Sequence, residues 1–268
     1  MMDLNLPHIC MAEVYSNMVR IKTSGFETSG GGGPRGNITG FSADSRKRML
    51  EMMNCLEFEK LTFVTLTYPA VWPEDGHEVK EHIRRFRARL EKKFGKLRVV
   101  WRMEYQERGA PHFHLIIMDA PFICRWWLSK AWVDSNDTKS WKNFLYGSNI
   151  KGIAQKGDSQ KVINYVCKYA GKVEEHVRTN DNEWCGRFWG KWNVEKPLPA
   201  LYQFDPGEAV RVVAGALSAR GSGSSWQPGN ELACRIFGSG VGSGDYGRLI
   251  SDSLEAFGAT RCERELDS

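Results

Sequence analysis

A pair of histidines separated by one residue is the strongest chemical signal in the sequence. His112 and His114 lie in an apolar run, HFHLIIM, that predicts a β-strand. Side chains alternate between the faces of a strand, so both imidazoles are expected on one face and Phe113 on the other. Glu104 precedes His112 by eight residues, on a strand predicted to pair with this one across a turn. These three side chains predict a site for a divalent metal ion that keeps coordination positions open for a substrate.

Gln106 is expected on the same face as Glu104 and is a further candidate, either as a ligand or as a support for one. Two alternatives stay open for this group of residues. An HxH tripeptide also occurs by chance on protein surfaces, and Glu104 could be a charge at the rim of the sheet.

A second group of candidate catalytic residues lies on a helix predicted for residues 158–172. Tyr165 and Tyr169 are four residues apart, a spacing that places two phenols on one helix face. Lys168 and Lys172 repeat this spacing, and a nearby ammonium group favours ionisation of a phenol, whose reference pKa is about 10. The alternative is that the rings pack in the core and the lysines are solvated.

The elements that must position these residues follow from hydrophobic periodicity. We predict helices at 43–56, 77–94 and 158–172, strands at 61–68, 97–105, 112–118 and 149–155, and a less regular tryptophan-rich stretch through Tyr146. This order predicts an α+β fold in which helices flank an antiparallel sheet, of the ferredoxin-like or RRM-like kind.

Glycine content divides the chain into three predicted parts. Residues 1–35 are expected to form an N-terminal extension that ends in a glycine-rich linker, and residues 36–199 carry all the candidate chemistry. Residues 200–268 are rich in glycine without sustained periodicity, and we expect a tail that is partly disordered or a small subdomain.

Positive charge is concentrated rather than uniform. Between Lys80 and Arg98 there are nine basic residues and two acidic ones, within a chain of net charge +5. Such a segment can hold a phosphate backbone, although an ordinary solvated helix face is the alternative. The candidate DNA-binding residues are Arg46, Arg48, Arg84, Arg85, Arg87 and Arg108.

Several classes of protein are disfavoured by what the sequence lacks. It contains no GxxxxGK[ST] phosphate-binding motif, and its seven cysteines are dispersed without a CxxC pair. No run of about 20 apolar residues predicts a membrane span, and the N-terminus does not resemble a secretory signal. A cytoplasmic protein with reduced cysteines and no membrane partner is therefore expected.

Three motifs in order resemble the HUH endonuclease superfamily. The string RGAPHFHLII at 108–117 resembles its His-hydrophobic-His motif, and FVTLTYP at 63–69 resembles its first motif. The string YVCKYAGK at 165–172 resembles the two-tyrosine motif of the gene A type initiators of single-stranded DNA phages. GRFWGKWN at 186–193 also resembles a stretch of phage and plasmid initiators, so the resemblance covers roughly residues 36–199.

This resemblance implies a rolling-circle replication initiator that nicks and rejoins single-stranded DNA at an origin. It implies Mg²⁺ or Mn²⁺ held by His112, His114 and Glu104, and Tyr165 or Tyr169 as the nucleophile. Attack would leave a 5′-phosphotyrosine and a 3′-hydroxyl primer, with Lys168 and Lys172 assisting. A host helicase, a polymerase and a single-strand-binding protein are the implied partners.

Other functions use parts of the same pattern. A relaxase or an HUH transposase would share the chemistry, whereas a non-catalytic RRM-like nucleic-acid binder would need neither the metal ligands nor the paired tyrosines. A zinc hydrolase is a third alternative, disfavoured by the lack of an obvious general base. Substitution of His112 would separate an enzyme from a binding protein, because only the enzyme would lose nicking while retaining DNA binding.

Overall fold

The structure is a computed structural model that describes residues 10–23, 40–155 and 186–205, together with shorter stretches at 208, 211–212, 215, 234–237, 245–256 and 258–262. The chain divides into two compact units. We call residues 34–50 and 58–195 the central unit, and residues 1–33, 51–57 and 196–268 the terminal unit.

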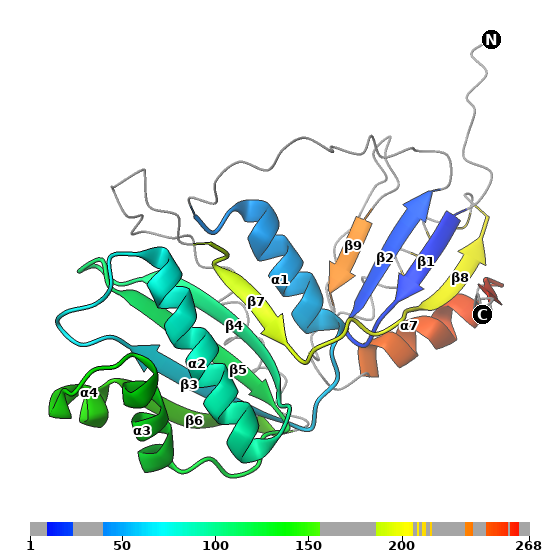
Figure 1. Ribbon diagram of the computed structural model, residues 1–268. Coiled ribbons are helices and arrows are strands. Elements are labelled where there is room, and N and C mark those ends of the chain that lie inside the picture. Colours follow the sequence, from blue (N-terminus) through cyan, green and yellow to red (C-terminus); the bar gives the residue numbers. More distant parts are fainter. Residues whose placement is uncertain are drawn as a thin grey trace, which may run out of the picture. The chain divides into compact units, whose positions relative to one another are not determined.

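The central unit is built on a five-stranded sheet with the strand order β6-β3-β5-β4-β7, in which every neighbouring pair is antiparallel (Figure 1). Its strands are β3 (Lys60–Thr67), β4 (Arg98–Tyr105), β5 (Pro111–Met118), β6 (Ser148–Gln155) and β7 (Trp189–Trp192). Its helices are α2 (Gly76–Phe94), α3 (Arg125–Ser135) and α4 (Trp141–Tyr146), together with the first part of α1 (Ala43–Cys55).

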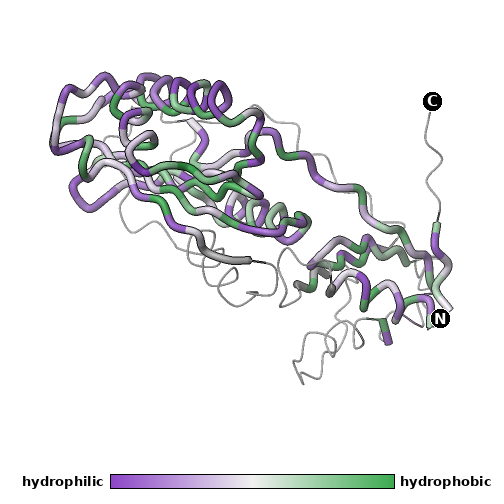
Figure 2. Tube along the Cα trace, turned by 90° about the horizontal axis from the view of Figure 1, so that it is seen from below, coloured by the Kyte–Doolittle hydropathy of each residue, from purple (hydrophilic) through white to green (hydrophobic). Residues whose placement is uncertain are grey.

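Two of the helices cover one face of this sheet. Phe113 of β5 packs edge-on against Trp132 of α3, and Trp132 in turn packs against Phe86 of α2. All three side chains are almost fully buried. Because β5 alternates, its odd-numbered residues face this helical layer and its even-numbered residues face the opposite side. Figure 2 shows the hydrophobic colouring concentrated along the strands and the hydrophilic colouring on the outer helices and loops.

Helix α2 forms where the sequence pattern predicts it. Asp75 caps its first turn by accepting a hydrogen bond from the backbone N–H of His77 at 2.8 Å, and Gly95 ends it with a positive φ of 79°. The buried residues recur at the spacing of a helix and include Val79, Ile83, Phe86 and Leu90. The charged residues of the helix therefore lie mostly on its outer side.

Strand β7 completes the sheet only because residue 190 is a glycine. Gly190 lies opposite Trp101 of β4, and a Cβ atom at position 190 would lie 2.7 Å from the indole ring. Its neighbours Trp189 and Lys191 consequently belong to the face of the sheet that carries the histidines.

The terminal unit contains a second five-stranded antiparallel sheet, with the order β10-β8-β1-β2-β9. Its strands are β1 (Cys10–Val14), β2 (Met18–Thr23), β8 (Ala200–Phe204), β9 (Cys234–Phe237) and β10 (Thr260–Cys262), and its helix is α7 (Asp245–Ala256). Ile21, Tyr202 and Ile250 lie in one hydrophobic cluster, so the helix packs on this sheet.

The described strands from the two chain ends therefore belong to one sheet, a pairing that the sequence analysis does not predict. The strands of residues 200–268 are three to five residues long and are separated by glycine-rich sequence. Alternation over so few residues is too short to produce a detectable period in the sequence.

The predicted α+β class with an antiparallel sheet is confirmed. The tryptophan-rich stretch through Tyr146 forms the two helices α3 and α4. The helix predicted at 158–172 and the linker predicted at Gly30 to Gly33 lie outside the described residues. None of the helices among the described residues has the length and apolar character needed to span a membrane.

Candidate metal centre

Three side chains that sequence analysis proposes as metal ligands meet on the face of the central sheet opposite α2 and α3, which we call the histidine face. His112 lies directly opposite Glu104 in the pairing of β5 with β4, and His114 lies two residues further along β5. One potential ligand atom from each of the three residues lies within 4.8 Å of the others. A group of this size and composition can bind a single divalent ion.

The two imidazoles are held at a fixed angle to each other. Their ring centroids are 4.6 Å apart and the planes are nearly perpendicular, at 80°. His114 Nε2 lies 2.8 Å from Glu104 Oε1, which is hydrogen-bonding distance. The two residues are thus in direct contact, with His114 buried and Glu104 partly accessible.

Strand β3 supports both histidines from the side opposite β4. Thr67 pairs with His112 across the sheet, and its hydroxyl lies 2.9 Å from His112 Nδ1. A hydrogen bond at Nδ1 fixes the ring and directs Nε2 away, as metal-binding histidines require. Phe63 stacks on His114 with a centroid distance of 5.5 Å and an interplanar angle of 20°.

A buried arginine sets the electrostatics of the site. Arg102 is only 1% exposed, lies 4.6 Å above the Phe41 ring, and has a guanidinium nitrogen 3.8 Å from Glu104 Oε2. Burial by itself raises the pKa of Glu104, but the hydrogen bond and the charge interaction with His114, followed by the charge interactions with Arg102 and His112, outweigh it and lower the pKa to about 2. Glu104 is therefore an ionised carboxylate at neutral pH, the form that binds a cation.

The donor set fits a small divalent ion. Two imidazole nitrogens and one carboxylate oxygen suit Mn²⁺ and similar ions, and Mg²⁺ is bound through the carboxylate with more of its water retained. Three protein ligands leave coordination positions for substrate oxygens. The supporting residues Thr67, Phe63 and Arg102 were missed in the sequence, although the alternation of β3 places Phe63, Thr65 and Thr67 on one face.

Gln106 is held by a different partner. It follows the end of β4 in a tight turn, and its side-chain oxygen lies 3.0 Å from Arg108 Nε, which donates a hydrogen bond. Arg108 also donates to the backbone carbonyls of Tyr68 and Pro69 and lies 4.9 Å from the Trp72 ring. Arg108 therefore fixes the loop after β3, and Gln106 contributes to that contact.

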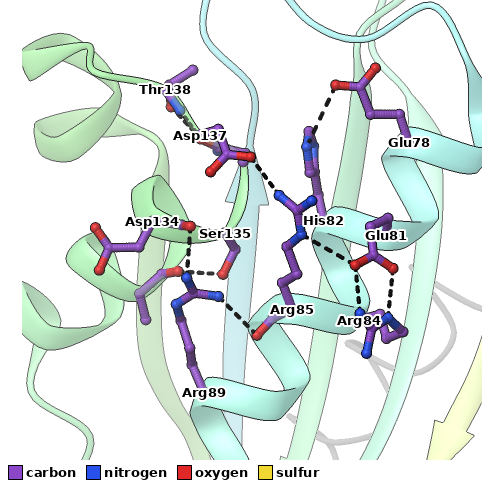
Figure 3. Close-up of polar contacts among 12 residues, drawn as sticks. Glu78, Glu81, His82, Arg84, Arg85, Arg89, Asp134, Ser135, Asp137 and Thr138 are labelled. Atoms are coloured by element: carbon purple, nitrogen blue, oxygen red, sulfur yellow. Dashed lines mark hydrogen bonds and ion pairs between the residues drawn. The ribbon is translucent and has the colours of Figure 1, made fainter.

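The arginines of α2 that we consider for DNA binding are largely paired with carboxylates (Figure 3). Arg84 makes two hydrogen bonds of 2.6 Å to Glu81, and Arg85 contacts both Glu81 and Asp137. Asp137 follows α3, so the Arg85 pair joins α2 to the segment after α3. In this structure these two guanidinium groups serve the packing of the helical layer.

The remaining basic candidates are distributed over other contacts. Arg87 pairs with Glu91 at 2.9 Å and approaches Asn193, which follows β7. On α1, Arg48 donates a hydrogen bond to Ser45, and Arg46 is half-buried. The structure does not bring these candidates together around the three metal-site residues.

The tyrosine group cannot be compared with this geometry. Tyr165, Lys168, Tyr169 and Lys172 all lie outside the described residues. In the sequence they fall between β6 and β7, which are the two edge strands of the sheet that carries the histidines.

A cavity of about 840 Å³ lies at the end of β3. Thr67 lines it, and the other walls come from the loop after β3 and from α4, including Trp72, Lys142 and Tyr146. Because the Thr67 hydroxyl contacts His112, the cavity and the candidate metal centre share a residue.

Comparisons with known proteins point to DNA replication. Residues 61–174 match the model of a family described as Replication-associated protein ORF2 or gene 2 protein, a segment that runs from β3 through both tyrosines. The chain is 29% identical over 180 residues to a putative replication protein of Xylella fastidiosa strain Temecula1, which covers 59% of this chain and 62% of that protein.

A phage protein shows a similar relationship. The chain is 28% identical over 174 residues to a replication-associated protein of Pseudomonas phage Pf3, covering 59% of this chain and 60% of that protein. The chain thus spans about three fifths of the length of the curated relatives it matches. The matched relatives are named for replication, and the matched segment contains the complete histidine and glutamate group.

Proposed function

We propose that this protein is a metal-dependent enzyme that nicks and rejoins single-stranded DNA through a tyrosine and thereby initiates rolling-circle replication. The observation that carries the proposal is the group formed by Glu104, His112 and His114, whose ligand atoms lie within 4.8 Å of one another. This group lies inside the segment that matches the replication-associated family.

Each residue of the site has a distinct part in this chemistry. Glu104, His112 and His114 would hold Mg²⁺ or Mn²⁺, and the bound ion would supply Lewis acidity to the scissile phosphate. Thr67 keeps the ring of His112 oriented, and Arg102, together with His114, favours the ionised form of Glu104. The burial of Arg102 and His114 on the sheet limits movement of the ligands, so the phosphate is bound in one position.

Tyr165 or Tyr169 would be the nucleophile. A bond forms between the phenol oxygen and phosphorus while the bond from phosphorus to the 3′-oxygen breaks. The phenol proton is lost to solvent or to a neighbouring base, and the departing 3′-oxygen takes up a proton to become the primer hydroxyl. The 5′-phosphotyrosine keeps the phosphodiester energy, so the reverse reaction rejoins a strand without a nucleotide cofactor. Lys168 and Lys172 would favour the phenolate form.

Two tyrosines permit successive rounds. One phenol carries the 5′ end of the displaced strand, and the second can attack when replication regenerates the origin. On a helix, a spacing of four residues separates them by about 6 Å along the axis, within reach of the same phosphate. The sequence has no P-loop motif, so strand separation is expected from a host helicase.

Detection of the covalent intermediate tests the proposal. The protein is incubated with Mn²⁺ and single-stranded oligonucleotides that tile its replicon, and the products are examined by denaturing gel and peptide mass spectrometry. We expect an oligonucleotide linked to Tyr165 or Tyr169, and no adduct in EDTA. Tyr15→Phe, the same substitution in the terminal unit, is the matched control and should form the adduct like the wild type.

Variants of the two tyrosines refine the result. Tyr165→Phe and Tyr169→Phe should each retain single-round cleavage but lose successive circle release, and the double variant should form no adduct. If one single variant is inactive and the other supports repeated rounds, the enzyme uses one tyrosine. Undiminished cleavage in chelator would refute the metal assignment.

A further inference from the structure

Three aromatic rings form a continuous stack on the surface of α3 and α4. Phe144 lies between Trp126, at 5.9 Å and 15°, and Trp141, at 5.2 Å and 17°, measured between ring centroids and planes. Trp126 is 55% exposed and Trp141 is 69% exposed. We call these three residues the aromatic stack.

The aromatic stack is separate from the hydrophobic core. Helix α3 buries Leu128 and Trp132 instead, and α4 buries Asn143. Two indole rings exposed to more than half of their area lose hydrophobic stabilisation unless something covers them, and such surface groups commonly mark binding sites. Because the rings already share nearly parallel planes, a ligand with flat faces could extend the stack with little ordering of side chains.

The charge around the aromatic stack is positive. Residues 138–155 contain Lys139, Lys142 and Lys151 and no acidic residue, and all three lysines are exposed. The guanidinium of Arg125 lies 5.6 Å from the Trp126 ring. The acidic residues nearest in sequence, Asp134 and Asp137, are paired with Lys130 and Arg85 respectively.

Helix α4 connects the aromatic stack to the candidate metal centre. Its exposed residues Lys142 and Tyr146 line the cavity that Thr67 also lines, and the hydroxyl of Thr67 contacts His112. Helix α4 therefore carries two residues that line the cavity and, on another side, two rings of the aromatic stack, Trp141 and Phe144.

We infer that the aromatic stack, with its surrounding basic residues, is a binding site for the single-stranded DNA that flanks the cleaved phosphate. This inference rests on the proposed function, because it concerns the strand that the enzyme would cut. Single-stranded nucleic acid offers flat bases and a phosphate backbone together, and aromatic rings interleaved with cations bind both. A duplex keeps its base faces covered, and lysine is depleted in protein–protein interfaces, so the same surface suits these partners less well.

Fluorescence anisotropy in EDTA measures this binding without cleavage. The probe is a 5′-fluorescein-labelled (dT)20, and the double variant Trp126→Ala/Trp141→Ala is compared with Trp126→Phe/Trp141→Phe. We expect the alanine pair to weaken binding by about tenfold or more, because it removes two stacking partners. The phenylalanine pair keeps two flat rings and should stay within about threefold of the wild type.

Tryptophan emission reports where the strand binds. Stacking of bases on Trp126 and Trp141 should quench wild-type emission when unlabelled (dT)20 is added, and the phenylalanine pair should lose most of that quenching while still binding. Leu198→Ala, an exposed apolar position of the terminal unit, is the surface control and should change neither signal. Circular dichroism of each variant checks that the fold is intact.

Two results would overturn the inference. One is unchanged (dT)20 affinity in the alanine pair, and the other is a change in oligomeric state, seen by light scattering, that accounts for the exposed rings as a contact between copies. His112→Ala separates this test from the proposed function, because it should abolish adduct formation and leave (dT)20 binding unchanged. Cleavage with unchanged affinity in the alanine pair would reject the aromatic stack alone, whereas stack-dependent binding without any adduct would reject the proposed activity alone.

Discussion

The two sides of the central sheet hold their charged side chains in opposite ways. On the histidine face, His112, His114 and Glu104 converge within 4.8 Å, and His114 is buried. In the helical layer, Arg85 is partly exposed and is paired with Glu81 of α2 and with Asp137 of the segment after α3 (Figure 3). In the first arrangement, the ligand atoms converge on one point. In the second, the positive charge of the arginine is neutralised by the paired carboxylates. Density of charge in a sequence therefore says less about function than convergence and burial do.

The largest expected effect is the loss of a metal ligand. His114→Ala and His112→Ala should each reduce Mn²⁺-dependent cleavage by about a thousandfold or more, because removing one of three protein ligands affects both ion affinity and ligand geometry. The assay is single-turnover cleavage of an oligonucleotide that the wild type cuts. His77→Ala, an exposed histidine of α2, is the matched control. An equal loss of cleavage in all three variants would show that the effect is not specific to the histidines of the histidine face.

Glu104→Ala belongs to the same comparison but should be milder if water replaces the carboxylate. Retention of near wild-type activity by this variant would leave a two-histidine site and remove Glu104 from the ligand set. Isothermal titration with Mn²⁺ would then show whether affinity, activity or both depend on the carboxylate.

A smaller effect is expected from the support of His112. Thr67→Val keeps the shape of the side chain but removes the hydroxyl that contacts Nδ1, so Mn²⁺ affinity should fall by about 10- to 100-fold. Thr67→Ser keeps the hydroxyl and should remain close to the wild type. The measurement is calorimetric titration with Mn²⁺, and equal affinities in Val and Ser variants would argue against a role for this hydrogen bond.

Disruption of the helical layer should have a modest effect. Arg85→Ala removes surface ion pairs to Glu81 and Asp137, and should lower the melting temperature by no more than about 3 °C, because such pairs are screened by solvent. The dependence of DNA affinity on salt should stay unchanged. A decrease of about one in the slope of log K against log salt would instead assign Arg85 to a phosphate contact, as its position in the basic segment suggests.

The smallest expected effect is a pH dependence of stability from His82 in α2. Burial lowers the pKa of His82, and the neighbouring Glu78 only partly offsets it. The unfolded chain then binds more protons than the folded one below the ordinary pKa of about 6.5, so stability is lost as pH falls through this value toward 5. His82→Gln should reduce the loss between pH 7.5 and 5.5 in urea unfolding, whereas His77→Gln should not.

Glu104 on the histidine face should affect stability in a different pH window. The pKa of Glu104 is lowered to about 2, so its contribution to stability is present above about 4.5 and is lost between there and about 2. Loss of stability in this window is not confined to Glu104, because the pKa of Glu81 in α2 is also lowered to about 2, chiefly by its hydrogen bond to Arg84. Glu104→Gln should therefore lose less stability than the wild type between about pH 4.5 and 2, and an equal loss would contradict the contribution of Glu104.

Most of the central unit could be predicted because its strands and helices are long enough to show a period. The histidine pair and Glu104 were predicted together since strand alternation and a short turn determine which face they share. Arg102 and Thr67 could not be predicted as partners of the site, because their contacts depend on the register across three strands. The pairing of the terminal sheet could not be predicted for a related reason, since β1 pairs with β8 and β2 pairs with β9, each from a distant part of the chain.

The pairing of the α2 arginines was also hidden in the sequence. Glu81 and Arg85 have a spacing that suggests a helical ion pair, but Asp137 approaches only after α3 packs against α2. In the same way, Trp126 and Trp141 are fifteen residues apart in the sequence. Phe144 follows both of them in the sequence, although its ring lies between theirs in the structure. The aromatic stack therefore exists only in the folded chain.

Thr67 also connects the candidate ligand His112 to a residue of the helical layer. Its hydroxyl contacts His112, while its backbone carbonyl accepts a 2.8 Å hydrogen bond from the indole of Trp132, a buried residue of α3 that packs against α2. The orientation of the His112 imidazole therefore depends on how the Trp132 indole packs in the core. A substitution that opens a cavity at Trp132 should therefore misalign His112, and the proposed activity should be lost although the three ligands are intact.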